Sequence, residues 1–72
     1  MKGFADRLRE AREERGWTRY RLAREANIGD ALVYSYENGE KTPGAANLAA
    51  LAKALGVPAD RLLGIDDPEA AA

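Results

Sequence analysis

The sequence predicts an all-α domain of five short helices around one small core. The chain has 72 residues and is rich in alanine, with only one Phe, one Trp and three Tyr. This composition favours closely packed helices over a sheet, and apolar residues recur at helical spacings of three and four. Glycine and proline interrupt the pattern at short intervals, so each helix is short. A chain of this length buries only roughly 60–65% of its unfolded surface, so its stability is expected to be marginal.

Two helices are predicted in the first third of the chain. The first runs from residue 4 to residue 15 and ends at Gly16, since three apolar residues share one helix face: Phe4, Leu8 and Ala11. The second begins after Thr18, a natural N-cap, and ends near Asn27. Trp17 is placed to pack on this helix as a hydrophobic staple. The apolar stripe of the second helix is narrow and consists of Leu22, Ala23 and Ala26.

Residues 31–36 allow two interpretations. They are rich in β-formers, and the following Asn38-Gly39 is typical of a hairpin. However, the next residues, 40–43, are polar and end in proline, so no second apolar run could pair with such a strand. A helix from Asp30 to about Glu37, with Asn38-Gly39 as its C-cap, is therefore favoured.

The last two helices follow Pro43-Gly44. One is predicted to end at Gly56, because four apolar residues occupy i, i+3, i+4 and i+7: Leu48, Leu51, Ala52 and Leu55. A final short turn is expected from Ala59 to Leu63. Residues 1–64 are thus predicted to form one domain, and residues 65–72 an acidic and alanine-rich disordered tail.

The composition excludes several functions. There is no Cys and no His, which rules out disulfides, Cys/His zinc sites, thiol nucleophiles and histidine bases. We therefore predict no catalytic residue, no metal, no cofactor and no enzymatic activity. Asp66, Asp67 and Glu69 could form a weak cation site, but a solvated acidic tail is favoured. No apolar run approaches the roughly 20 residues that span a bilayer, and no signal peptide is recognised, so a cytoplasmic location without a membrane partner is expected.

The charge is unevenly distributed along the chain. Eleven basic and twelve acidic residues give a net charge of −1 and a pI of about 5.4. Residues 1–26 have a net charge of +3, residues 27–56 of −1 and residues 57–72 of −3. On charge alone, solvated helix faces with pairs such as Arg9 with Glu13 and Arg21 with Glu25 are favoured over a binding surface.

Several short motifs occur together in a fixed order. They are R-x-x-x-G at 12–16, Leu22-Ala23, Glu37-Asn38-Gly39 and L-A-x-x-L-G-V at 51–57. Together they resemble the phage repressor/Cro-type, or lambda repressor-like, helix-turn-helix family over about residues 4–63. The resemblance implies a compact five-helix DNA-binding domain with a regulator-like function. It also implies a structural ion pair between Arg12 and Glu37.

In this family the third helix enters the major groove. The resemblance implies that base edges face five side chains of that helix: Asp30, Ala31, Leu32, Tyr34 and Ser35. The sequence departs from the family pattern here, since no Arg is available for guanine and no Asn or Gln for adenine. Asp30 could accept from cytosine N4, Ala31 or Leu32 could touch a thymine methyl, and Tyr34 or Ser35 could donate one hydrogen bond. An equally weighted alternative is that Asp30 only stabilises the helix N-terminus.

The phosphate contacts that the resemblance implies come from helix starts and from the loop after the third helix. They are Thr18, Arg19, Asn38, Lys41, Gly44, Ala45 and Asn47. Thr18 and Asn38 can also act simply as caps, and Arg19 and Lys41 as solvated charges.

The leading hypothesis is sequence-specific binding of double-stranded DNA, by a monomer or a weak homodimer with an apolar patch at Leu62 or Ile65. A bacterial chain would then be associated with the nucleoid. The alternative is a protein-interaction domain of the same fold that does not bind DNA, which the acidic pI and the unusual third helix favour. The same features are compatible with an engineered reader on this scaffold.

Overall fold

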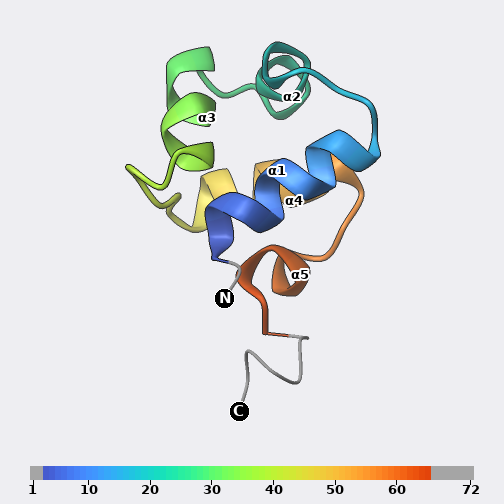
Figure 1. Ribbon diagram of the computed structural model, residues 1–72, viewed down its shortest axis with the longest axis vertical. Coiled ribbons are helices and arrows are strands. Elements are labelled where there is room, and N and C mark those ends of the chain that lie inside the picture. The colour runs from blue at the N-terminus through green and yellow to red at the C-terminus, as the bar shows by residue number, and fades with distance from the viewer. Residues whose placement is uncertain (1–2, 66–72) are drawn as a thin grey trace.

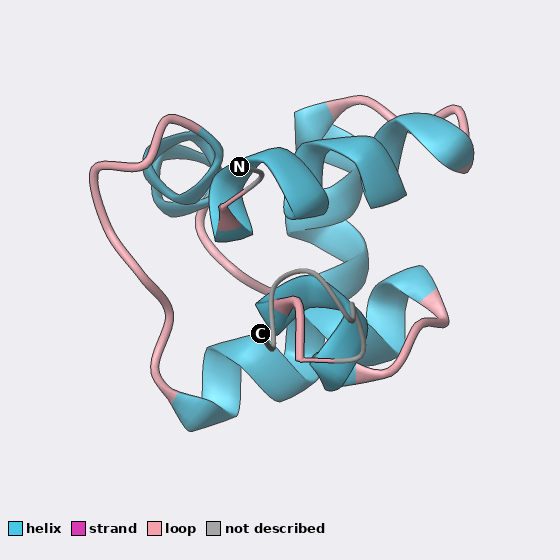
Figure 2. Cartoon of the chain, turned by 60° about the horizontal axis from the view of Figure 1, so that its bottom comes forward, coloured by secondary structure: helices cyan, strands magenta, loops and turns pink. Residues whose placement is uncertain are grey.

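Five α-helices follow one another in the computed structural model, which describes residues 3–65 (Figure 1). They are α1 (Phe4–Glu14), α2 (Arg19–Ala26), α3 (Asp30–Glu37), α4 (Ala45–Leu55) and α5 (Ala59–Leu63). The prediction of an all-α fold is confirmed, and residues 3–65 contain only helices and loops (Figure 2). The ambiguous segment 31–36 is helical, as favoured from the sequence.

The helices form a bundle in which several of the contacts join helices that are not consecutive in the chain. Helix α1 contacts α3 and α5, α2 contacts α3 and α4, and α4 also contacts α5. Helices α2 and α3 lie together at one end of the molecule, and α5 lies at the other end (Figure 1). The α2–α3 unit thus packs against α1 and α4.

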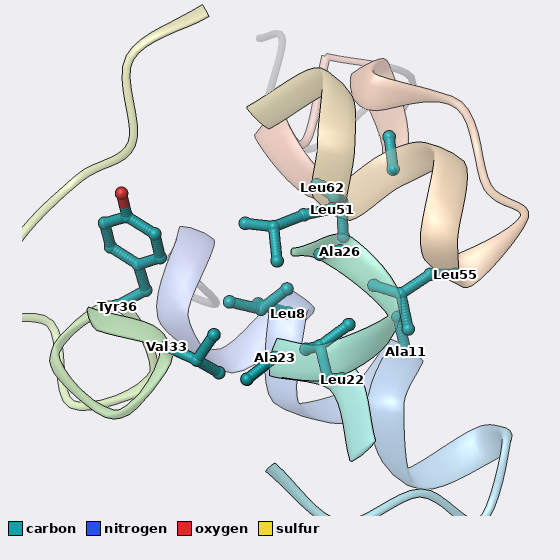
Figure 3. Close-up of a cluster of buried hydrophobic side chains, with 11 residues drawn as sticks. Leu8, Ala11, Leu22, Ala23, Ala26, Val33, Tyr36, Leu51, Leu55 and Leu62 are labelled. Atoms are coloured by element: carbon teal, nitrogen blue, oxygen red, sulfur yellow. The ribbon is translucent and has the colours of Figure 1, made fainter. Parts of the chain in front are cut away.

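One apolar core joins all five helices (Figure 3). Its fully buried side chains are Leu8, Leu22, Val33, Leu51 and Leu62. Burying each such side chain contributes roughly 1.5–3 kcal/mol. Ala23 and Ala26 are also buried, and their small size lets α2 approach its neighbours closely. Because Leu62 is 0% exposed, it cannot form the surface patch expected from the sequence.

Local caps fix the helix ends. The Thr18 side chain accepts a hydrogen bond of 3.0 Å from the Arg21 backbone N–H, which begins α2. Asn27 ends α2 in the left-handed region with φ of 56°, and Gly56 ends α4 with φ of 70°. Asparagine and glycine are the residues that adopt this conformation at least cost, which is why α2 and α4 stop there.

The C-terminal segment is described only as far as Ile65. The Ile65 backbone N–H donates to the Asp60 carbonyl at 3.0 Å, and its side chain is exposed. The rest of the predicted tail, 66–72, lies outside the described residues, and so does the weak cation site considered there. The predicted boundary near residue 64 therefore stays a prediction. Within residues 3–65, no helix is long and apolar enough to cross a membrane.

Candidate nucleic-acid interface

Helices α2 and α3 are joined by a three-residue turn, 27–29, which sets the direction of α3. The buried face of α3 consists of Val33, Tyr36 and Glu37. Its opposite face exposes Asp30, Ala31 and Tyr34 to solvent. Helix α3 is therefore fixed to the core on one side and presents polar and small side chains on the other.

An ion pair fixes the C-terminal end of α3 to α1. Arg12 Nε donates to Glu37 Oε2 at 2.7 Å, and Arg12 Nη2 donates to Glu37 Oε1 at 2.9 Å. Arg12 Nη1 also donates to the Trp17 carbonyl at 2.8 Å, which ties in the α1–α2 turn. The two side chains are only 13% and 3% exposed. The hydrogen bond from Glu37 raises the pKa of Arg12 despite the opposing effect of burial, so the guanidinium stays charged.

A second polar contact joins α3 to α4. Asn47 Nδ2 donates to the hydroxyl of the buried Tyr36 at 2.9 Å. The resemblance implied a phosphate contact through the backbone amide of Asn47, and the contact of its side chain with α3 leaves that amide available. The backbone N–H groups at 45–47 lie in the first turn of α4, before the first helical hydrogen bond, from Leu48 to Gly44. These N–H groups are suited to bind a phosphate.

The five expected base-reading residues differ in exposure. Asp30, Ala31 and Tyr34 are exposed, whereas Leu32 and Ser35 are half-buried. Leu32 packs against the core, so it has less side-chain surface to offer a ligand. The structure thus brings three of the five expected base-reading residues together on the open face of α3.

The remaining phosphate candidates surround this face. Thr18 and Arg19 lie at the start of α2, and Asn38 and Lys41 in the loop after α3, all of them exposed. Asn38 is also the C-cap of α3, and its N–H donates to the Tyr34 carbonyl at 3.0 Å. Capping and DNA contact are therefore compatible at Thr18 and Asn38.

Sequence reasoning missed a contact between α2 and α3. The guanidinium carbon of Arg19 lies 4.5 Å from the centre of the Tyr34 ring. A groove beside this pair is also lined by Thr18, Tyr20, Asp30 and Ala31. The two residues are fifteen positions apart and belong to different helices, so no periodic pattern could have revealed the contact.

Tyr20 was also missed. It is 57% exposed, and its hydroxyl accepts a hydrogen bond of 2.9 Å from Arg24 Nη1. The i,i+4 spacing of Tyr20 and Arg24 on α2 is a signal that could have found this pair.

Several other arginines are paired on the surface. Arg21 pairs with Glu25 as expected, at 3.0 Å. Arg9 pairs with Asp6 at 2.8 Å rather than with Glu13, so that expectation was wrong. Arg9 and Arg21 are therefore paired within their own helices, whereas Arg19 at the start of α2 and Lys41 in the loop after α3 form no ion pair with a described residue.

The fold and this site define a helix-turn-helix DNA-binding domain. The helix-turn-helix family matches residues 8–62, which is most of the chain, and the chain belongs to this family. The resemblance inferred from the sequence motifs is thereby confirmed.

A solved structure shows the same arrangement. The chain is 30% identical to the restriction-modification controller protein C.AhdI from Aeromonas hydrophila, with a TM-score of 0.81. The match covers 83% of this chain and 91% of that one. No curated protein matches the chain significantly. The chain is thus a lambda repressor-like domain whose partner is double-stranded DNA, bound sequence-specifically in a regulator-like function.

Proposed function

We propose that the chain regulates transcription by inserting α3 into the major groove of double-stranded DNA. The observation that carries this proposal is the division of α3 into a buried face and an open face that exposes Asp30, Ala31 and Tyr34. In a helix-turn-helix domain the second helix of the motif lies in the major groove and the first crosses the backbone. Helix α2 would then lie across the phosphates.

Phosphate contacts would hold α3 in its register. Thr18 and the first turn of α2 would contact phosphates of one DNA strand. Further phosphates would be contacted by Asn38, Lys41 and the N–H groups of residues 45–47. Helix N-termini attract phosphate through their free N–H groups and the helix dipole. Within the described residues, no side-chain hydrogen bond caps the start of α4. The N–H groups of its first turn are therefore available to a phosphate, which supports this role.

The output of such a domain is occupancy of DNA, not catalysis. The similarity to a restriction-modification controller protein supports a regulatory role. We further propose that the chain acts as a monomer or a weak homodimer in the cytoplasm. Leu63 and Ile65, which are 45% and 60% exposed, take the place of the buried Leu62 as the apolar surface available for weak association.

The test is titration of the protein with a pool of random duplexes at two salt concentrations. A protein that contacts a handful of phosphates should bind at about 50 mM salt and weaken by up to about a thousandfold at about 200 mM. Absence of binding at the lower concentration would contradict the proposal and favour the protein-interaction alternative.

Two lysines provide a matched pair of variants. Lys41→Gln should weaken binding to all sequences and reduce the slope of log affinity against log salt by about 1. Lys53→Gln makes the same charge change near the end of α4, about 12 Å further along that helix than Ala45. It should leave the slope unchanged, because Lys53 lies away from the first turn of α4.

A further inference from the structure

Arg19 differs from the other arginines in how its donors are used. Six others donate side-chain hydrogen bonds to described residues: Arg9, Arg12, Arg15, Arg21, Arg24 and Arg61. Arg19 donates none to any residue in 3–65. Its contact there is with the face of the Tyr34 ring, 4.5 Å away. A cation–π contact occupies no hydrogen-bond acceptor of the protein, so the N–H groups of Arg19 are available to donate to a ligand.

Asp30 lies beside this free donor group. It is four residues before Tyr34 and therefore on the same face of α3. Asp30, Arg19 and Tyr34 line one groove. No ion pair joins Asp30 to Arg19 or to another described residue. The groove thus offers a planar set of donors and a carboxylate acceptor, neither of which is paired with any residue in 3–65.

This combination matches one base pair in the major groove. Guanine presents two acceptors there, N7 and O6, and its cytosine presents a donor at N4. An arginine donates to both guanine acceptors, and an aspartate accepts from the cytosine amine. An A·T pair would instead place the acceptor O4 of thymine towards the carboxylate, which is repulsive.

The same groove is poorly suited to a phosphate. The Asp30 carboxylate would repel a phosphate held against Arg19, and the Tyr34 ring holds the guanidinium towards α3. We propose that Arg19, supported by Tyr34, acts with Asp30 to read a G·C pair in the major groove. This assignment, which replaces the expected phosphate contact of Arg19, rests on the proposed function. It also supplies the guanine-reading arginine that α3 itself lacks.

The proposal is tested by selecting preferred sites from random duplexes with the full chain and its variants. Wild-type sites should contain an invariant G·C pair. Arg19→Lys keeps the charge but not the planar donors, so it should lose about 5- to 100-fold in affinity for the selected site and show a weaker preference for guanine. Its binding to random duplexes and its salt dependence should be unchanged. Asp30→Asn should relax the preference at the same base pair.

Two further variants examine the role of the ring. Tyr34→Phe keeps the aromatic face and should retain the preference for guanine. Tyr34→Leu removes that face and should weaken the preference although Arg19 is present. Arg24→Lys makes the same change as Arg19→Lys elsewhere on α2 and should leave the selected site unchanged. Melting temperatures of all variants should stay close to wild type, since these side chains are exposed.

The outcomes distinguish this inference from the proposed function. If Arg19→Lys binds the selected site like wild type, and Arg19→Ala weakens all sequences alike with a lower salt slope, Arg19 contacts phosphate and the inference is wrong. Selected sites without an invariant G·C pair would also overturn it. Failure of the wild-type chain to bind any duplex would instead contradict the proposed function itself.

Discussion

The guanidinium groups of Arg12 and Arg19 are held in opposite ways. Arg12 is nearly buried, and its donors are taken by Glu37 and the Trp17 carbonyl. Arg19 is exposed and lies over the Tyr34 ring, and its donors bond to none of the described residues. Removing one partner of a buried pair destabilises the fold because the other charge is left alone, whereas free donors on a preorganised side chain are available to a ligand. The first arginine is therefore structural and the second is suited to recognition.

Arg12→Ala should lower the free energy of unfolding by roughly 3–5 kcal/mol, because the Glu37 carboxylate would stay buried without a partner. A small domain has only about 5–15 kcal/mol in total, so the variant should be close to unfolding. Urea unfolding followed by circular dichroism at neutral pH measures the change.

Arg9→Ala is the control, since it removes an exposed arginine whose pair with Asp6 contributes only about 0–1 kcal/mol. Combining Arg12→Met with Glu37→Leu should recover much of the loss, because neither charge is then left alone. Equal destabilisation by Arg12→Ala and Arg9→Ala would show that the buried pair has no special role.

The raised pKa of Arg12 has a defined consequence for stability. A basic group whose pKa is higher in the folded than in the unfolded state contributes all of its stabilising free energy at pH values below its pKa in the unfolded state. This contribution is lost only as the pH rises through its pKa in the folded state. Both values lie far above neutrality for arginine. The Arg12 contribution should therefore be constant between roughly pH 6 and pH 9, which unfolding of wild type and Arg12→Ala over that range would check.

At the scale of helices, local chemistry was sufficient to predict where most of the elements begin and end. The bounds Asp30–Glu37 and Ala59–Leu63 agree with the structure, because caps, glycines and prolines act within a few residues. Residues 31–36 were ambiguous locally. Their helical state depended on the absence of a partner strand, a property of the surrounding chain rather than of the segment.

Contacts between helices were much harder to predict. The motifs implied the Arg12–Glu37 pair only through resemblance to a family. The Arg19–Tyr34 contact and the bond from Asn47 to Tyr36 depend on how helices cross, which sequence spacing does not encode. The sequence therefore predicted which helices carry the candidate interface, and this stays a prediction, whereas the partners of its side chains required the structure.

Thr18→Ala should lower the free energy of unfolding by about 1 kcal/mol, since the Arg21 N–H at the start of α2 would lose its acceptor. For a domain of this size that corresponds to a fall in melting temperature of about 4–8 °C. Thr42→Ala makes the same change at an exposed loop position outside any helix and should have a much smaller effect. Equal shifts in the two melting curves would show that the cap does not contribute.

At the scale of the whole molecule, a net charge of −1 conceals a separation of charge. Residues 1–26, which include α1 and α2, have a net charge of +3, and residues 57–72 of −3. Helix α5 itself carries one acid and one base, Asp60 and Arg61, and the other acids of that segment, Asp66, Asp67 and Glu69, lie outside the described residues. Near-neutrality therefore limits long-range attraction to DNA without removing the local positive charge beside α3.

Neutralising the acidic C-terminal residues should strengthen non-specific binding to DNA, and only at low salt. The combined change Asp66→Asn, Asp67→Asn and Glu69→Gln raises the net charge from −1 to +2. At about 20 mM salt the affinity for random duplexes, measured by fluorescence anisotropy, should rise several-fold. At about 200 mM salt the Debye length is below 10 Å, and the gain should fall to less than about twofold. The selected site should not change, because these residues carry no base contact in the proposed complex.

Deletion of residues 70–72 alters no side-chain charge and serves as the control. A gain that persisted undiminished at the higher salt concentration would mean that the acidic residues act at the interface itself and not through the long-range field.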